Sequence, residues 1–255
     1  MKNNIKYILG IHDGHNCGAA LINEGKVVTS ISEERLTRKK NEVGYPRLSI
    51  EECLKIQNID AGEIDEVVFA SNFMHTAEHL EGIEEWYLVG KKDQEREENK
   101  PKTYEKIVFE KRRSERISSV CNHLSVSKDK VSFVEHHLAH LAAAYYTTPN
   151  ADEGKSFLGL TCDGAGDGLS ATVSICRDNS IERISSTSRD ASLGKIYSRI
   201  TMLAGFKPWE HEYKIMGLAP YADQKISYSA AEPLRSLLKL SSKDLKFILG
   251  QDLST

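Results

Sequence analysis

The sequence predicts an α/β fold built from two like lobes, because strand and helix patterns alternate and the opening pattern occurs twice. Three short β-rich runs, separated by turns that contain glycine or asparagine, stand at residues 7–11, 19–22 and 27–31. A helix is expected from Ser49 to Gln57, since a serine followed by Glu51 and Glu52 is typical of a helix start.

Two further strands and one helix are expected in the first half of the chain. Glu66–Ala70 and Val131–Val134 are short and β-rich. Glu135–Tyr146 is rich in alanine and runs toward Pro149, so a helix is expected that stops before the proline. Residues 91–116 carry dense charge of both signs, which fits either a solvated helix or loop or an insertion that faces a substrate.

A weak internal repeat relates the two halves. Residues 157–164, ending in Asp-Gly, echo residues 8–14, and similar apolar, polar-turn and β-rich stretches follow both copies. Folds of the actin, hexokinase and Hsp70 type contain two like lobes, and an Asp-Gly turn in each lobe binds nucleotide phosphates through backbone N–H groups. We expect a first actin-like lobe over 1–150, with a charged insertion near 91–116, and a second over 151–255. Less chain follows Ser156 than the first copy uses, so the second lobe is expected to be incomplete.

Composition places the chain among ordinary globular proteins. Of its 255 residues, 28% are charged and 40% hydrophobic, and the formal net charge of -3 gives no electrostatic reason to expect nucleic acid as a partner. The five cysteines are scattered without a Cys-x-x-Cys pair, which favours a reducing compartment. No signal-peptide pattern or membrane-length apolar run is visible, so we expect a cytoplasmic protein without a membrane partner.

Two histidines predict a metal site. His136 and His140 are four residues apart, so on a helix they share one face and can grip one ion, whereas His137 points elsewhere. A third, oxygen ligand is sought in Cys-Asp163-Gly-Ala-Gly-Asp167-Gly, and Asp163 is the better candidate because it ends a predicted strand. Two histidines and a carboxylate suit iron, zinc or manganese. The alternative is that the histidines are packed core residues.

Three other stretches offer chemistry, each beside a structural alternative. His12, Asp13 and His15 either cap a hairpin or supply a general base near a phosphate loop. Glu33–Lys40 is either an exposed charged turn or a cationic site for a phosphate or acyl phosphate. Glu212–Tyr221 fits a helix that stops at glycine and proline.

Taken together, these stretches resemble the O-carbamoyltransferases of the NodU/CmcH family, which includes the tobramycin carbamoyltransferase. The order and spacing of six motifs carry the resemblance, which extends from near residue 5 to near 222: Gly10–Ile22, Glu33–Lys40, His136–His140, Asp163–Gly168, Ser192–Ser198 and Lys214–Tyr221.

The resemblance implies an ATP-dependent O-carbamoyltransferase. Its amino-terminal part would be Kae1/TsaD-like, with duplicated ribonuclease-H-like lobes, and would move a carbamoyl group from carbamoyl adenylate to a hydroxyl of a small acceptor such as a sugar or natural product. A carboxy-terminal YrdC-like domain, absent from this chain, would make that intermediate from carbamoyl phosphate and ATP. The chain is therefore expected to be a fragment, not fully active alone. Magnesium would accompany the nucleotide.

The resemblance also implies roles for single residues. His136, His140 and Asp163 correspond to the metal ligands, and His15 to the base that deprotonates the acceptor. Lys40 corresponds to the lysine that handles carbamoyl adenylate, with Lys39 a near-equal candidate and Arg35 in the same cationic motif. Gly164, Gly166 and Gly168 would approach the phosphates.

Two departures and two alternatives accompany this interpretation. Asn41 and Asn16 stand where the family commonly has histidine and aspartate, and an amide orients a general base such as His15 less strongly than a carboxylate does. One alternative is a relative of the TsaD threonylcarbamoyl transferases that acts on tRNA. The other is a non-catalytic nucleotide- or metal-binding fragment.

Overall fold

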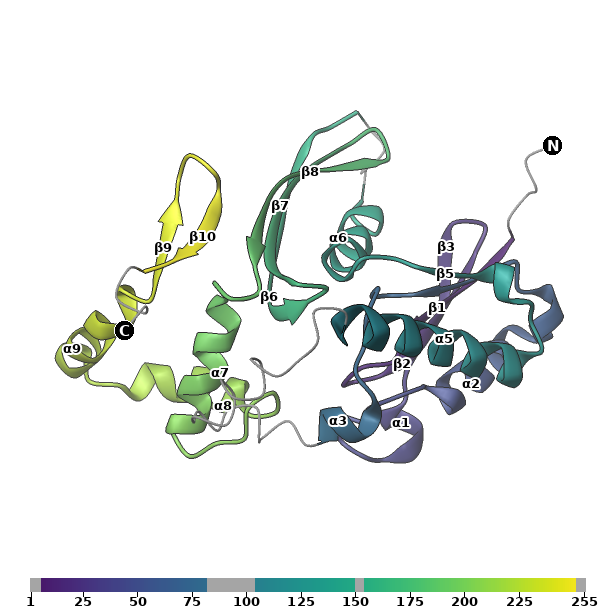
Figure 1. Cartoon of the computed structure of the whole chain (residues 1–255), viewed down its shortest axis with the longest axis horizontal. Helices are drawn as coiled ribbons and strands as arrows, with labels where there is room; N and C mark the ends of the chain where they lie inside the picture. The colour runs from purple at the N-terminus through teal and green to yellow at the C-terminus, as the bar shows by residue number, and fades with distance from the viewer. Residues whose placement is uncertain (1–5, 82–103, 150–153, 251–255) are drawn as a thin grey trace. The chain divides into compact units, whose positions relative to one another are not determined.

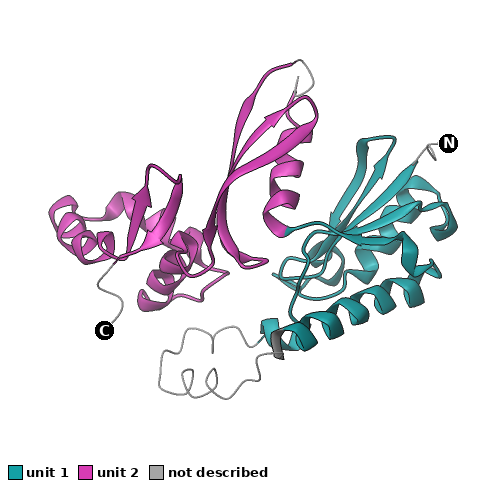
Figure 2. Cartoon of the chain, turned by 45° about the horizontal axis from the view of Figure 1, so that its top comes forward, with its two compact units in different colours: residues 1–135 teal, residues 136–255 magenta. Residues whose placement is uncertain are grey.

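The computed structural model describes residues 6–81, 104–149 and 154–250, and their contacts divide the chain into two compact units. Unit 1 ends at Glu135 and unit 2 begins at His136 (Figure 2), ahead of the boundary at 150/151 expected from the sequence. The earlier boundary follows from the packing of helix α6 (His136–Tyr146) on the strands that come after it.

Unit 1 holds a five-stranded mixed sheet in the order β3-β2-β1-β4-β5 (Figure 1). Strands β1 to β3 form an antiparallel meander, and β4 and β5 add parallel to β1. This is the hairpin-plus-crossover arrangement of a ribonuclease-H-like lobe, so the predicted α/β class is confirmed. The elements of unit 1 are β1 (Tyr7–His12), β2 (Gly18–Asn23), β3 (Lys26–Ser32), α1 (Glu34–Thr37), α2 (Arg47–Gln57), η1 (Ala61–Glu63), β4 (Glu66–Phe69), α3 (Ala77–Glu81), α5 (Tyr104–Leu124), η3 (Lys128–Lys130) and β5 (Val131–Phe133).

One face of this sheet is buried under two helices. The core cluster contains side chains from β1, β2 and β4 together with Ile50, Cys53 and Leu54 of α2 and Val120 and Leu124 of α5. Strand β1 alternates buried and half-buried positions, as a strand with one covered face should. Residues 104–116 of the charged stretch belong to α5, while 91–103 lie outside the described residues.

The start of α2 corrects one expectation. The helix begins at Arg47, two positions before the predicted Ser49, and Ser49 is buried inside its first turn. Its first amides are capped from elsewhere: the Glu33 carboxylate accepts from Leu48 N at 2.9 Å and from Ser49 N at 2.7 Å. A buried carboxylate at a helix N-terminus accepts hydrogen bonds from the free N–H groups and interacts favourably with the helix dipole.

Unit 2 repeats the antiparallel meander in β6-β7-β8. The turns after the second strand of each meander match, since Glu24 and Gly25 in unit 1 and Asp178 and Asn179 in unit 2 all have positive φ. This confirms the repeat detected in the sequence. The elements of unit 2 are α6 (His136–Tyr146), β6 (Phe157–Gly166), β7 (Leu169–Arg177), β8 (Ser180–Ser188), α7 (Leu193–Leu203), α8 (Glu212–Leu218), η4 (Ala219–Tyr221), α9 (Gln224–Arg235), β9 (Leu238–Ser241) and β10 (Lys246–Leu249).

Helix α6 covers β6 and β7, with Leu141 and Tyr145 packed against Cys176 and Phe157. Helix α7 also packs on β6. Among the described residues β6 pairs with β7 alone, whereas β1 has a partner strand on both edges. No helix in the described part of the chain combines the length and apolar character of a membrane span.

A buried ion pair joins α5 to the end of β1. Arg116 and Asp13 are 3% and 4% exposed, and the guanidinium donates two hydrogen bonds of 2.8 Å to the carboxylate. Its remaining N–H groups bind Ser71 O at 3.0 Å, Asn72 O at 3.2 Å and Ser71 Oγ at 3.2 Å, so all five donors are used. The pair therefore fixes the loops that follow β1 and β4.

Arg116→Met should lower the free energy of unfolding by about 3–5 kcal/mol, because Asp13 would remain buried without its partner. Arg47→Met is the matched control, since Arg47 forms an exposed pair with Glu51 at 2.9 Å and its loss should cost under about 1 kcal/mol. Urea unfolding of both variants measures the difference. Equal, small losses would show that the buried pair does not stabilise unit 1.

Candidate metal centre

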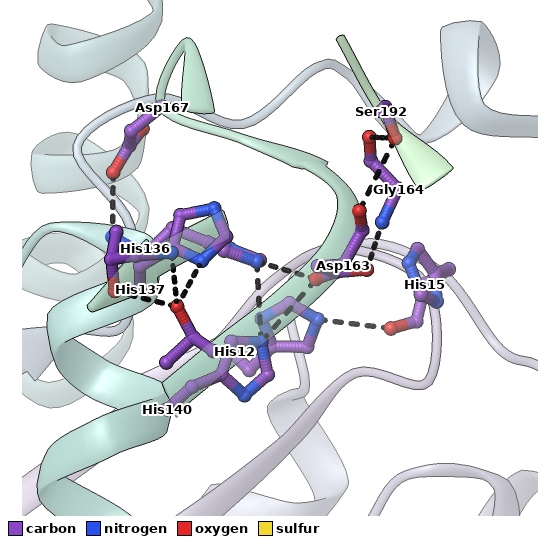
Figure 3. Close-up of polar contacts among 11 residues, drawn as sticks. His12, His15, His136, His137, His140, Asp163, Gly164, Asp167 and Ser192 are labelled. Atoms are coloured by element: carbon purple, nitrogen blue, oxygen red, sulfur yellow. Dashed lines mark hydrogen bonds and ion pairs between the residues drawn. The ribbon is translucent and has the colours of Figure 1, made fainter. Parts of the chain in front are cut away.

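Three side chains of unit 2 converge on one point (Figure 3). His136 Nε2 lies 2.7 Å from Asp163 Oδ2 and 3.2 Å from His140 Nε2, and His140 Nε2 lies 3.5 Å from the same carboxylate oxygen. Their ligand atoms all lie within 4.8 Å of one another. The two histidines share a face of α6 because they are four residues apart.

A bulge in β6 aims Asp163 at the histidines. The register pairs Cys162 with Ala171 and next pairs Gly166 with Leu169, so β6 contains more residues than β7 between these pairs. Such bulges re-aim side chains at the ends of strands. The sequence favoured Asp163 because it was expected to end a strand. The structure corrects this reason, because β6 continues to Gly166 and Asp163 lies in a bulge within the strand.

The environment of Asp163 favours its ionised form. Burial acts to raise the pKa of this carboxyl, but hydrogen bonds from His136, His140 and the Gly164 amide outweigh it and hold the pKa well below its ordinary value. A carboxylate beside two imidazole nitrogens is a donor set suited to one divalent ion of the zinc, iron or manganese type. The residues present therefore fit the implied metal.

A second layer of contacts supports these three residues. Asp167 Oδ2 accepts a hydrogen bond of 2.8 Å from the His136 backbone N–H. Ser192 caps α7 by accepting from Lys195 N at 3.0 Å and donates to Gly164 O at 2.6 Å. A Cβ on Gly194 would lie 2.9 Å from Asp163 O, so the start of α7 packs directly on the Asp163 peptide.

His137 lies outside this group. Its side chain is fully buried, and its Nδ1 lies 2.9 Å from Thr161 Oγ1. The hydroxyl of Thr161 is also 2.6 Å from that of Thr172, which ties α6 to both β6 and β7. His137 is thus a packed residue of the sheet–helix interface, as the helical spacing of the three histidines indicated.

The three glycines of the loop have different surroundings. A Cβ on Gly166 would lie 2.1 Å from His136 Cγ, so this glycine makes room for the imidazole. Gly168 has φ +84 and forms a two-residue turn with Asp167, whose φ is 47. Nothing lies within 4 Å of a Cβ on Gly164. Gly168 has the same open space, but its positive φ already requires a glycine there, whereas nothing in the backbone requires one at 164.

In unit 1, His15 lies in the loop after β1 and pairs with Val43 as an isolated β-bridge. His12 Nε2 is 2.9 Å from His15 O, and Asn16 Nδ2 is 3.5 Å from His15 Nδ1. Asn16 has φ 53, a left-handed conformation that asparagine tolerates. The side-chain amide of Asn16 therefore lies beside the His15 imidazole. The nearby Asp13 carboxylate is hydrogen-bonded to Arg116.

The cationic motif of unit 1 is exposed and partly paired. Lys40 Nζ lies 3.2 Å from Glu34 Oε2, and that carboxylate also accepts from Asn41 N at 3.0 Å. The hydrogen bond from the Asn41 backbone N–H lowers the pKa of Glu34, and the smaller effect of the Lys40 side chain acts in the same direction. Lys39 lies 3.7 Å from Glu42, and Arg35 is exposed. The cations face solvent, as the exposed-turn alternative expects, whereas Glu33 is buried and caps α2. The phosphate-site alternative stays a prediction.

Two residues escaped the sequence analysis. Arg116 stands in a charged run, but it shares a helical face with Val120 and Leu124, and that spacing is a signal that could have marked it as buried. Glu33 belongs to a stretch predicted as either an exposed charged turn or a cationic site, and its capping of α2 leaves no local signal because the helix begins far along the chain.

Comparison with known proteins agrees with the motifs. Residues 7–247 match the protein family described as Carbamoyltransferase N-terminus. This chain belongs to that family. Among curated relatives, an uncharacterized protein of Methanocaldococcus jannaschii is 31% identical over 244 residues, covering 95% of this chain and 38% of its own length. Nodulation protein NolNO of Sinorhizobium fredii is 27% identical over 213 residues, covering 84% and 28%.

The coverage percentages also show how much of each relative this chain matches. The chain spans well under half of the length of the curated relatives it matches. Among solved structures, YeaZ from Pseudomonas aeruginosa aligns over 70% of this chain and 64% of its own, at 12% identity and a TM-score of 0.35. That score is too low to support an argument. The resemblance carried by the motifs is confirmed as membership of the Carbamoyltransferase N-terminus family.

Gly166→Ala should displace the His136 ring and lower the free energy of unfolding by about 1–3 kcal/mol, the usual cost of an added methyl in a filled space. Gly164→Ala is the control, since its methyl would meet nothing within 4 Å. Thermal unfolding and the imidazole NMR signals of His136 measure both effects. If the two variants behaved alike, Gly166 would not be needed to seat the histidine.

Proposed function

We propose that this region carries out the transfer step of an ATP-dependent O-carbamoyltransferase. It would move a carbamoyl group from carbamoyl adenylate, made from carbamoyl phosphate and ATP, to the hydroxyl of a sugar or other small natural product. The convergence of His136, His140 and Asp163 in a chain of the carbamoyltransferase N-terminus family supports this proposal most directly.

The three converging residues would hold one divalent ion, of iron, zinc or manganese. When bound, such an ion supplies Lewis-acid polarisation of a nucleotide-type oxygen. The chain's own contribution is to orient the donors: α6 presents the two imidazoles on one face, and the bulge in β6 brings the Asp163 carboxylate beside them. Magnesium would accompany ATP.

The unit 1 residues would handle the acceptor and the anionic donor. His15 would take the proton from the acceptor hydroxyl, a role that suits an imidazole because its ordinary pKa lies near neutrality. Lys40, Lys39 and Arg35 would offset negative charge on carbamoyl adenylate. Lys40 is exposed and lies beside Glu34, so its ammonium is accessible to an anionic ligand.

The loop glycines would contribute unequally to nucleotide binding. Gly164 has open space at its side-chain position and is the one we assign to phosphate approach. Gly166 and Gly168 already have structural reasons to be glycine, so their part in binding would be indirect. Formation of carbamoyl adenylate would fall to a YrdC-like domain in a polypeptide of the relatives' length.

His136→Gln and His140→Gln should each weaken binding of Zn²⁺ or Mn²⁺ at least tenfold, because each removes one nitrogen donor. His211→Gln is the control, a histidine of the same unit that accepts a hydrogen bond from Lys207 N at 3.1 Å outside the cluster. Isothermal titration calorimetry gives the dissociation constants. Equal affinity in all three variants would remove the metal assignment.

In a polypeptide of the relatives' length that contains this region, His15→Asn should lower carbamoylation of the acceptor by about 10²–10⁴-fold, the usual contribution of a general base. Lys40→Met should also lower it, whereas Lys55→Met should not, although Lys55 forms a comparably exposed pair with Glu52 at 3.1 Å. The assay follows acceptor carbamoylation together with AMP and pyrophosphate release from ATP and carbamoyl phosphate. Tight, salt-sensitive tRNA binding without these products would instead support a TsaD-like activity.

A further inference from the structure

Helix α6 begins at the metal-ligand candidate itself. His136 is its first residue, so the His136 backbone N–H is one of the donors that a helix leaves without an intrahelical acceptor. Asp167 Oδ2 accepts from this N–H at 2.8 Å. A carboxylate at this end of a helix also interacts favourably with the helix dipole.

The backbone of the hairpin sends Asp167 to this position. Asp167 and Gly168 form the two-residue turn between β6 and β7, flanked by the pair Gly166–Leu169. Both turn residues have positive φ, 47 and +84. Figure 3 shows the Asp167 side chain reaching from the turn to the start of α6.

One short loop therefore contacts His136 at three places. Asp163 binds its ring nitrogen, Gly166 lies against its ring carbons, and Asp167 binds its backbone N–H. Asp167 Oδ2 is engaged at the helix backbone, and the residues whose ligand atoms meet are His136, His140 and Asp163. The contacts fix both ends of the histidine, the peptide and the imidazole.

We propose that Asp167 is a positioning residue for a divalent-cation site, which fixes the start of α6 so that His136 Nε2 meets Asp163 and His140. The proposal rests on the metal site of the proposed function. It assigns Asp167 to the support of a ligand, although the sequence had offered it as a possible ligand. Residues that orient a metal ligand commonly contribute about tenfold to hundredfold to metal affinity.

The test uses two substitutions that the turn tolerates. Asp167→Gly removes the carboxylate without adding strain at positive φ, and Asp167→Asn keeps an acceptor oxygen while removing the charge. Asp178→Gly is the matched control. Asp178 is likewise the first residue of a two-residue turn in this sheet, with φ 50, and its ion pair at 3.3 Å is with its neighbour Arg177.

Two measurements separate positioning from general stability. Calorimetry with Zn²⁺ or Mn²⁺ should show affinity about tenfold to hundredfold weaker in Asp167→Gly, a smaller loss in Asp167→Asn and none in Asp178→Gly. Amide hydrogen exchange should accelerate at His136 in Asp167→Gly and stay unchanged there in Asp178→Gly. Both glycine variants are expected to lower the melting temperature, so a change in stability alone does not explain a change in affinity.

The outcomes distinguish this proposal from the one it rests on. Binding that depends on His136 but is equal in Asp167→Gly and Asp178→Gly would overturn the positioning role and leave the metal site standing. Absence of any His136-dependent binding in the unsubstituted protein would overturn the metal site, and the positioning role with it. Weakened binding in Asp167→Gly with unchanged exchange at His136 would also overturn it, because Asp167 would then act as a ligand.

Discussion

The architecture of unit 1 depends on one buried cation. Arg116 extends from α5 to the carboxyl ends of the strands, where it binds Asp13 after β1 and Ser71 and Asn72 after β4. Its guanidinium also lies over the rings of Phe69 and Phe133, 4.4 and 5.0 Å from their centroids, at the ends of β4 and β5. A buried charge is tolerated because all its donors and its counter-ion are satisfied. The edge of the sheet from which the candidate catalytic loop departs is therefore rigid.

The two units hold their corresponding loops by different means. In unit 1, a buried cation anchors Asp13, and backbone bonds from Cys17 N to Glu42 O and from Gly44 N to Gly14 O fasten the rest of the loop. In unit 2, the loop after the first strand is held by the starts of two helices, through the His136 amide of α6 and through Ser192 at α7. The two meanders are alike, but their loops are held by different interactions. Among the described residues, a cluster of side chains that could bind a metal occurs at the unit 2 loop alone.

The strands, the repeat and the histidine pair could be predicted because each depends on local period or spacing. The interactions that position the site could not, because each joins residues far apart in sequence. Glu33 caps a helix that starts beyond Pro46, so Ser49 looked like the cap. Arg116 stands in a charged run, where its helical spacing to Val120 and Leu124 signals burial but does not identify Asp13 as its partner. Asp163 was preferred over Asp167 from the sequence, but the bulge in β6 that brings it beside the histidines is specified by no local propensity.

The glycines of the unit 2 loop resemble a phosphate-binding pattern, but two of them have structural reasons to be glycine. Gly166 is explained by the His136 ring and Gly168 by its turn, so neither requires a phosphate. Even at Gly164, the backbone N–H is engaged by Asp163 Oδ1 at 2.5 Å. An anion bound through that amide would have to displace the carboxylate oxygen, whereas an ion held by Oδ2 would leave the bond to Oδ1 in place. In the loop as it stands, Asp163 Oδ1 engages the Gly164 N–H, while Oδ2 lies beside His136 and His140.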